Sequence, residues 1–321
     1  MAGRADTPLD RIPDIDYGAH PLFGRGAGRP GPAARLAGYL RYAEIVAYVV
    51  GLRLWQLAAR RPWTESGATP HLEELRRDGI VPLRLAPAAR ADVLGAAEPY
   101  FDRLAERRRA IERGRRRYAD GQLDTTRAGA PALFAAVERA LTDAGILASV
   151  RAYLGCRAVV RKVTMQINDE WDSFWREPFE SRGLPLPETA FFHVDNTYDV
   201  VKVIVYASEV GATSGPFSYV AGTNRLRTGM LEGLWLRATD IWIDVRPEHG
   251  ALLPTLPRAL RRRAKFGDDI PPDAEWGRRL LAQERVLTSA AGDALLFDVG
   301  GIHRGGLVAR GERRILQIMM R

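Results

Sequence analysis

Three side chains that could bind a metal ion stand out in the sequence, although they are far apart along the chain. His193 and Asp195 lie two residues apart before the apolar run "DVVKVIVYASEV", and His303 follows the apolar stretch "GDALLFDV" within a cluster of glycines. On a β-strand, residues i and i+2 point to the same face, so His193 and Asp195 would project side by side. A surface pair or a buried ion pair would explain these two residues equally well.

The addition of His303 changes the interpretation of this pair. Two histidines and one carboxylate on one face form the ligand set of non-heme iron(II) oxygenases. Such a set leaves three positions open on an octahedral metal, which is enough for a bidentate 2-oxo acid and dioxygen together. The glycines around His303 permit close backbone approach, as the rim of a metal site often requires. The sequence therefore predicts an iron(II) site at His193, Asp195 and His303.

A 2-oxo dicarboxylate also needs a cation for its far carboxylate, and an arginine can bind that group with two parallel donors. Arg314 lies eleven residues after His303, at the start of the last apolar strand, "ILQIMM". Arg313 is expected to face the opposite side of that strand, and Arg310 lies in the turn "ARGE". The sequence therefore favours Arg314 as the partner of the co-substrate.

Other polar side chains are weaker candidates for the same site. Gln166, Lys202 and Tyr206 are expected on strands where they could line the co-substrate pocket, although an ordinary strand position would explain them as well. Asn168 and Trp171 lie where the first of these strands ends, and they are candidates for substrate contact.

Five sequence pieces in order resemble the phytanoyl-CoA dioxygenase family of iron(II)/2-oxoglutarate-dependent oxygenases over about residues 70–321. They are "EELRRDGIVPLRL", "HVD", "SGPFSYVAGTNR", "GDALLFDVGGIHRGG" and "RRILQ". The resemblance implies that His193, Asp195 and His303 bind iron and that Arg314 binds 2-oxoglutarate. It also implies hydroxylation of a C–H bond with release of succinate and CO2. Relatives that halogenate replace the carboxylate ligand with a small residue, so Asp195 favours hydroxylation.

The order of expected elements indicates an α+β fold. Helices are expected at about 36–61, 88–114 and 130–147, and short strands at about 157–168, 285–288, 294–299 and 315–320. The family resemblance implies a double-stranded β-helix, a jelly-roll or cupin-like barrel with helices packed outside. Residues 1–69 are expected to form an N-terminal helical extension to an oxygenase domain at 70–321, and residues 226–283 a mostly helical insertion within that domain.

Composition restricts the class of protein further. The chain has 46% hydrophobic residues, a single cysteine and a formal charge of +8, so it can build a large core and has no disulfide framework. No secretory signal is visible at the start, which makes a cytoplasmic location the expectation. The basic run Arg107–Arg117 lacks alternating aromatic residues, so nucleic acid is not an expected partner.

The helix at 36–61 has too short an uncharged run to span a bilayer, but it could lie on the inner membrane surface. The expected substrate is a small molecule, anionic, lipid-linked or part of a glycan, and the sequence indicates no oligomeric state. A second function also fits the ligand set: a metal-binding cupin-like barrel, acting as a sensor or isomerase, without oxygenase turnover.

Overall fold

The structure is a computed structural model, and the part of the chain that it describes excludes several loops. The described residues are 8–9, 11–20, 23, 30–59, 67–112, 118–170, 179, 183–186, 189, 192–195, 200–226, 229–246 and 248–321. Among them, no helix is both long and apolar enough to cross a membrane.

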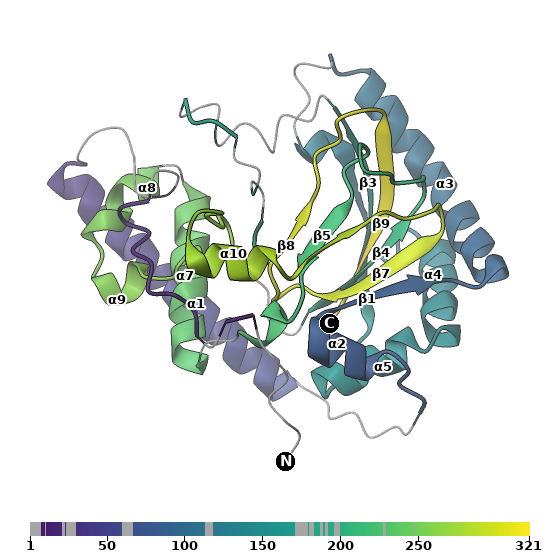
Figure 1. The fold of residues 1–321 in the computed structure, drawn as a ribbon, viewed down its shortest axis with the longest axis horizontal. Helices are drawn as coiled ribbons and strands as arrows, with labels where there is room; N and C mark the ends of the chain where they lie inside the picture. The colour runs from purple at the N-terminus through teal and green to yellow at the C-terminus, as the bar shows by residue number, and fades with distance from the viewer. Residues whose placement is uncertain are drawn as a thin grey trace.

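Two antiparallel sheets form the centre of the molecule (Figure 1). The larger sheet has the strand order β1-β7-β4-β9-β3-β2 and the smaller has the order β6-β5-β8. The larger sheet contains β1 (Ile80–Arg84), β2 (Gln122–Thr125), β3 (Val160–Asp169), β4 (Val201–Tyr206), β7 (Asp293–Asp298) and β9 (Glu312–Met320). The smaller contains β5 (Phe217–Val220), β6 (Glu284–Leu287) and β8 (His303–Gly305).

Strand alternation gives the larger sheet two different faces. On β9, Leu316 and Ile318 pack into a core shared with the helices, whereas Ile315 packs into a second core with Phe217 and Tyr219 of the smaller sheet. Because successive side chains point to opposite faces, a strand buried on both sides separates the two cores. The site described below lies on the face that looks toward the smaller sheet.

Helices cover the other face of the larger sheet. They are α2 (Leu72–Asp78), α3 (Pro87–Arg109), α4 (Pro131–Asp143) and α5 (Ile146–Leu154). The turn between α4 and α5 is made at Gly145, which has a φ of +68°. A side chain rarely adopts this conformation, so the single helix expected at 130–147 is in fact two helices. The expected mixture of helix and antiparallel sheet is confirmed, while the double-stranded β-helix stays a prediction.

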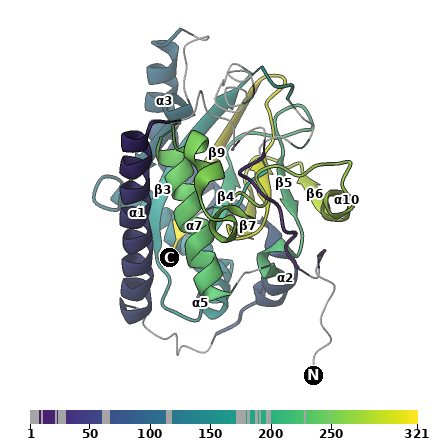
Figure 2. The same cartoon turned by 90° about the vertical axis from the view of Figure 1, so that its left-hand side faces the viewer.

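A second group of helices, here called the helical lobe, stands beside the sheets (Figures 1 and 2). It combines α1 (Pro32–Ala59) with α7 (Met230–Val245), α8 (Glu248–Leu252) and α9 (Arg258–Arg261). Trp242 of α7 is fully buried in this lobe and donates a hydrogen bond to the carbonyl oxygen of Gly38 in α1, at 3.0 Å. The N-terminal helix therefore packs against the insertion that follows β5, more than 170 residues later in the sequence.

Shorter elements connect these groups. They are α10 (Glu275–Leu281), η2 (Tyr118–Gly121), η3 (Thr223–Arg225) and η4 (Leu253–Thr255). The end of α1 is described only to Ala59, so the expected helix end near residue 61 lies outside the described residues. Part of the basic run Arg107–Arg117, which begins in the last turn of α3, is structural, because the buried Arg108 forms an ion pair with Asp169 at 2.9 Å.

Residues 11–20, here called the strap, join the helical lobe to the loop that follows α9. The backbone N–H of Arg263 donates to the carbonyl oxygen of Ile15 at 2.9 Å. Two atoms of the Arg261 guanidinium, Nε and Nη2, lie 2.8 and 2.9 Å from the carboxylate of Asp16. The strap thus holds a loop that also borders the site.

Candidate metal centre and adjoining cavities

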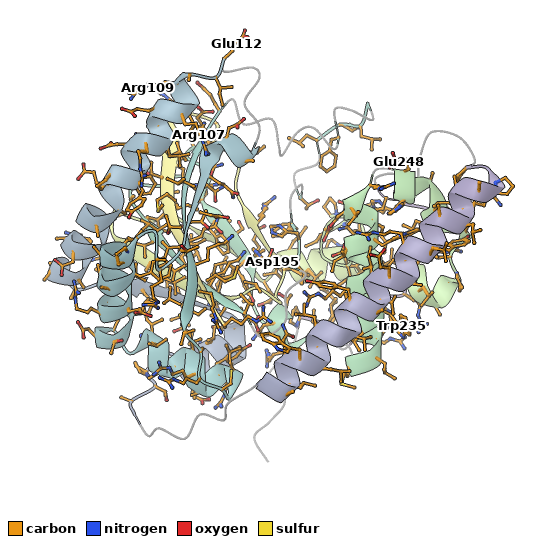
Figure 3. The ribbon with its side chains drawn as sticks, turned by 180° about the vertical axis from the view of Figure 1, so that it is seen from behind. Arg107, Arg109, Glu112, Asp195, Trp235 and Glu248 are labelled. Carbon is orange, nitrogen blue, oxygen red and sulfur yellow. The ribbon has the colours of Figure 1, made fainter. Side chains whose placement is uncertain are left out.

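Backbone pairing places the three predicted metal ligands together. The N–H of His193 donates to the carbonyl oxygen of His303 at 2.9 Å, and the N–H of His303 donates back to His193 at 3.0 Å. The N–H of Asp195 donates to Val299 at 3.1 Å, just beyond the end of β7. Asp195 therefore lies between the sheets and the helical lobe (Figure 3).

The ligand atoms of these residues lie within 4.8 Å of one another. Oδ1 of Asp195 is 3.5 Å from Nε2 of His193 and 4.0 Å from Nε2 of His303. Two donors bound to one ion at about 2.1 Å can be at most about 4.2 Å apart, so both separations already meet that limit. Among the described residues, this is the one group of three or more His, Cys, Asp or Glu side chains close enough to hold a metal ion.

The tautomer of His303 suits a metal ligand. Its Nδ1 is 2.8 Å from the carbonyl oxygen of Gly301, and because a carbonyl can only accept, Nδ1 carries the proton. Nε2 then presents its lone pair toward Asp195, which is the arrangement that a second hydrogen bond usually fixes in metal-binding histidines. Burial, together with the nearby His193, lowers the pKa of His303 to about 3, so the ring is neutral at ordinary pH.

Asp195 uses its two carboxylate oxygens differently. Oδ2 accepts a hydrogen bond from the Lys202 ammonium, while Oδ1 faces the two imidazoles. Burial alone would raise the pKa of Asp195, but Lys202, His193 and His303 outweigh it and hold the pKa well below its usual range. The carboxylate is therefore ionised, with one oxygen directed toward a metal position and the other fixed by a lysine on β4.

A cavity of about 120 Å³, here called the inner cavity, adjoins this centre between the two sheets. On β4 and β9 the residues that line it are spaced two apart, as expected for one face of a strand, and an apolar residue, Ile204 or Ile315, lies between two polar ones. The polar and charged residues that line it are Gln166, His193, Asp195, Lys202, Tyr206, His303, Arg313 and Gln317. The structure thus brings together Gln166, Lys202 and Tyr206, three of the weaker sequence candidates.

The arginine that lines this cavity is Arg313, whereas Arg314, the residue favoured from the sequence, does not line it. Arg313 is 3% exposed, and its guanidinium donates to the carbonyl oxygens of Gly215 and Gly306 and to Oδ1 of Asn168. Arg314 points to the other side of β9, where its Nε lies 2.6 Å from the carboxylate of Glu312. The two neighbours were correctly expected on opposite faces. The sequence analysis assigned the wrong face of β9 to the cavity. Gln317 is four residues after Arg313 and lies on the same face, so this second polar side chain was a signal for the correct face.

Asn168 has a different position from the one expected. Its Oδ1 accepts hydrogen bonds from Nη2 of Arg313, at 3.0 Å, and from Nε2 of Gln166, at 2.8 Å. Gln317 in turn donates to Oε1 of Gln166. Asn168 is not among the residues that line either cavity, and its hydrogen bond helps to hold Arg313, while its contact with substrate stays a prediction. Trp171 lies outside the described residues.

A larger cavity of about 310 Å³, here called the outer cavity, lies between the metal centre and the helical lobe. Asp195 lines both cavities, so the candidate metal position lies where they meet. The outer cavity has apolar walls that include Val194, Leu234 and Phe266. Three arginines from separate segments also line it: Arg53, Arg237 and Arg263.

A cluster of buried charges in the wall of the outer cavity was not expected from the sequence. The ammonium of Lys265 contacts Asp240, and it lies 3.0 Å from Asp268 and 3.3 Å from Asp244. Burial raises the pKa of Asp240 to about 7, since one lysine cannot balance every carboxylate around it. The available signal was an aspartate next to Ile241 and Trp242 in an otherwise apolar part of a helix.

No protein-family model matches the sequence, and no protein with a curated description matches it. Solved structures that resemble the chain include EctD from S. alaskensis with 2-oxoglutarate and 5-hydroxyectoine, at 15% identity and a TM-score of 0.45 over 81% of this chain and 82% of that one. AviO1 from Streptomyces viridochromogenes Tue57 has 16% identity and a TM-score of 0.42 over 80% and 96%.

The non-heme alpha ketoglutarate dependent carbocyclase SnoK from nogalamycin biosynthesis has 13% identity and a TM-score of 0.44 over 81% of this chain and 86% of that one. Similarity at this level does not by itself define the activity of the chain. The chemistry of the site has to be inferred from its own residues.

Proposed function

We propose that the chain is an iron(II)- and 2-oxoglutarate-dependent oxygenase that hydroxylates a C–H bond of an organic substrate, with release of succinate and CO2. The observation that carries this proposal is the convergence of His193, Asp195 and His303 at the junction of two cavities. A neutral imidazole with a fixed tautomer and an ionised carboxylate are the donors that ferrous iron requires. Bound iron would supply the dioxygen-activating redox chemistry.

The inner cavity is the proposed site of 2-oxoglutarate. Arg313 at its wall would bind the far carboxylate, and the hydrogen bond to Asn168 would hold the guanidinium fork in place. Lys202 and Tyr206 line the same wall and would contribute to the charge and the polar lining around the co-substrate. Apolar neighbours such as Ile204 and Phe297 would exclude water from the reacting groups.

The outer cavity is the proposed substrate site, because Asp195 lines it as well as the inner cavity. Its mixture of apolar walls and arginines supports an organic substrate that carries an anionic or strongly polar group, lipid-linked and glycan substrates included. The finer proposal is a phytanoyl-CoA dioxygenase-like enzyme with a double-stranded β-helix, acting in the cytoplasm on a small molecule and not on nucleic acid.

The adjacent arginines of β9 provide a matched test of the co-substrate site. Arg313→Gln removes two charge-assisted hydrogen bonds of about 1.5 kcal/mol each, so the affinity of the iron-loaded protein for 2-oxoglutarate should fall roughly 100-fold. Arg314→Gln, on the opposite face, should leave it unchanged. Equilibrium dialysis with 2-oxoglutarate measures both, and Arg313→Lys, which keeps the charge but loses the fork, should fall between them.

Iron binding is the control for this experiment, and His193→Ala should abolish it while both arginine variants retain it. Melting temperatures close to that of the wild type would exclude unfolding as the cause. Equal 2-oxoglutarate affinity in all the arginine variants would contradict the proposal. Iron binding without any affinity for 2-oxoglutarate would favour a metal-binding barrel that lacks oxygenase turnover.

A further inference from the structure

The outward face of α1 is apolar along almost its whole length. Leu36, Leu40 and Leu54 are 62–64% exposed on this face, and Tyr48 and Trp55 are 61–62% exposed beside them. The opposite face of the same helix, with Tyr42, Ile45 and Val49, is buried in the helical lobe. Figure 3 shows α1 crossing the near side of the lobe with no helix or strand drawn in front of it. Exposed apolar surface of this extent marks an interaction surface.

The exposed positions on this face are symmetric about Ala47. Leu40 and Leu54 lie seven residues on either side, Ala43 and Gly51 four residues, and Leu36 and Ala58 eleven residues. All seven positions are exposed. Since they follow one another at steps of three and four residues, they form a single seam along the helix. A second copy of α1 that runs antiparallel across this seam would place leucine against leucine and the small residues against one another.

The small residues at the centre permit a close approach. Ala43, Ala47 and Gly51 project little beyond the backbone, and a Cβ built at Gly51 would meet no atom within 4 Å. Helices that pack through such surfaces lie about 8–10 Å apart at a small crossing angle. In the antiparallel arrangement, Leu36 of each copy would fill the space beside Ala58 of the other.

The apolar area is close to what a stable dimer needs. Six large apolar side chains of α1 are 41–64% exposed, namely Leu36, Leu40, Tyr48, Leu54, Trp55 and Leu57. At about 200 Å² for each fully exposed side chain, they present roughly 700 Å² per copy. A standard protein interface buries about 800 Å² on each partner, and the alanines of the seam supply part of the remainder.

The charges on this face favour a second copy over a lipid surface. Arg41 and Glu44 are the charged residues among the exposed positions of α1, and they form an ion pair with each other at 2.6 Å. A helix that binds anionic lipid has an excess of lysine or arginine around its apolar face. Apart from the Arg321 guanidinium, which lies 5.8 Å from the centre of the Trp55 ring, the exposed charges of this face pair with each other, and this suits a self-complementary contact with twofold symmetry. We propose that two copies of the chain associate through α1, antiparallel about Ala47.

The first test is the mass of the full-length protein in solution. Size-exclusion chromatography with light scattering at micromolar concentration should give a dimer for the wild type. Leu40→Glu with Leu54→Glu places four carboxylates in the seam and should give a monomer with unchanged circular dichroism, because both side chains are exposed. Val286→Glu replaces another exposed apolar residue, on β6, and should remain dimeric.

The second test fixes the register and the direction of the pair. In a Cys156→Ser background, which removes the one native cysteine, Ala47→Cys should form an intermolecular disulfide under mild oxidation. Leu40→Cys alone should not, because its copies would be separated by fourteen residues, about 21 Å along the helix. An equimolar mixture of Leu40→Cys and Leu54→Cys should cross-link.

Three results would overturn the proposed dimer, and a fourth would overturn its antiparallel direction. The first is a wild-type monomer at micromolar concentration, and the second is a dimer that survives the paired glutamate substitutions. The third is binding to phosphatidylcholine–phosphatidylglycerol vesicles that the same substitutions abolish, which would assign the face to a bilayer. Cross-linking of Leu40→Cys with itself would replace the antiparallel pair with a parallel one.

Discussion

Single residues around Lys265 carry a charge imbalance inside the protein. The buried Asp240 and the half-buried Asp268 both contact the same ammonium group. Burial is the largest cause of the raised pKa of each carboxyl, and for Asp240 that value reaches about 7. Below about pH 7 Asp240 therefore binds a proton that the unfolded chain would release.

This imbalance predicts a pH dependence of stability with a definite sign. The pKa of Asp240 rises from 3.8 in the unfolded chain to about 7 in the folded protein. Between these two pH values the folded protein binds a proton at Asp240 that the unfolded chain does not bind. The free energy of unfolding that this proton contributes is complete below pH 3.8. It falls by about 1.4 kcal/mol per pH unit until the pH has risen through about 7.

Urea unfolding of wild type and Asp240→Asn across this range measures the effect. The wild type should lose unfolding free energy relative to the variant as the pH rises, with no further change above about pH 7. Asp273→Asn, at an exposed aspartate, is the control and should follow the wild type at every pH. Parallel curves for Asp240→Asn and the wild type would contradict the assignment.

The sequence was sufficient to predict which three side chains come together at the candidate metal centre, but not the direction of every other side chain. His193, Asp195 and His303 were predicted because their chemistry is specific and few other histidines compete with them. The choice between Arg313 and Arg314 depends on which face of β9 points toward the inner cavity. Both faces of β9 carry buried apolar residues, so the hydrophobic pattern does not show which face that is. The Lys265 cluster was missed because its members only meet when α7 packs against the loop after α9.

At the scale of elements, the loop after α9 supports the metal-binding segments from outside. Gly267 has a φ of +98°, and a Cβ placed there would lie 2.9 Å from Val194 and 3.0 Å from Ile302. Val194 lies between two proposed ligands, and Ile302 precedes the third. The backbone of the loop at Gly267 therefore packs so closely against Val194 and Ile302 that no side chain fits between them.

We expect Gly267→Ala to cost about 1–3 kcal/mol of stability and to weaken iron binding, because the added methyl group displaces these two neighbours. Thermal unfolding and titration with ferrous iron measure the two effects. Gly211→Ala is the matched control, since a Cβ at Gly211 meets no atom within 4 Å and its φ is not positive. Unchanged iron affinity in Gly267→Ala would show that the loop does not support the centre.

Elements with strong local signals were the ones that sequence reasoning identified. The helix α3 and the strands β7 and β9 have apolar patterns bounded by turn residues. β2 was missed because its four residues, "QLDT", carry no apolar alternation. It forms by pairing with β3 at the edge of the sheet, so tertiary contact and not local preference determines it.

For the whole molecule, we expect the contacts of the strap to determine the local stability of the helical lobe and of the loop beside the candidate metal centre. Asp16→Ala removes a half-buried contact with Arg261 and the cap on the N–H of Gly18, which together should cost about 1–3 kcal/mol. Amide hydrogen exchange should become faster in α7 and α9 and stay unchanged in β4 and β9. This difference between the helices and the strands is expected because the substitution would promote local unfolding of the helical lobe only.

A second aspartate of the strap provides the control. Asp14 contacts Arg258 at 3.4 Å in an exposed position, so Asp14→Ala should change stability by less than about 0.5 kcal/mol. Faster exchange throughout both sheets in Asp16→Ala would instead indicate that the lobe and the sheets unfold as one unit.

The pairing of α1 with α7 has a consequence for synthesis on the ribosome. α1 is complete at Ala59, but its partner begins only at Met230, and the strap contact between His20 and Asp269 requires still more of the chain. For most of translation, the nascent helix therefore exposes its inner apolar side as well as its outer one. A chaperone that captures apolar helices would find a binding segment in α1 until α7 and the chain up to Asp269 have been made.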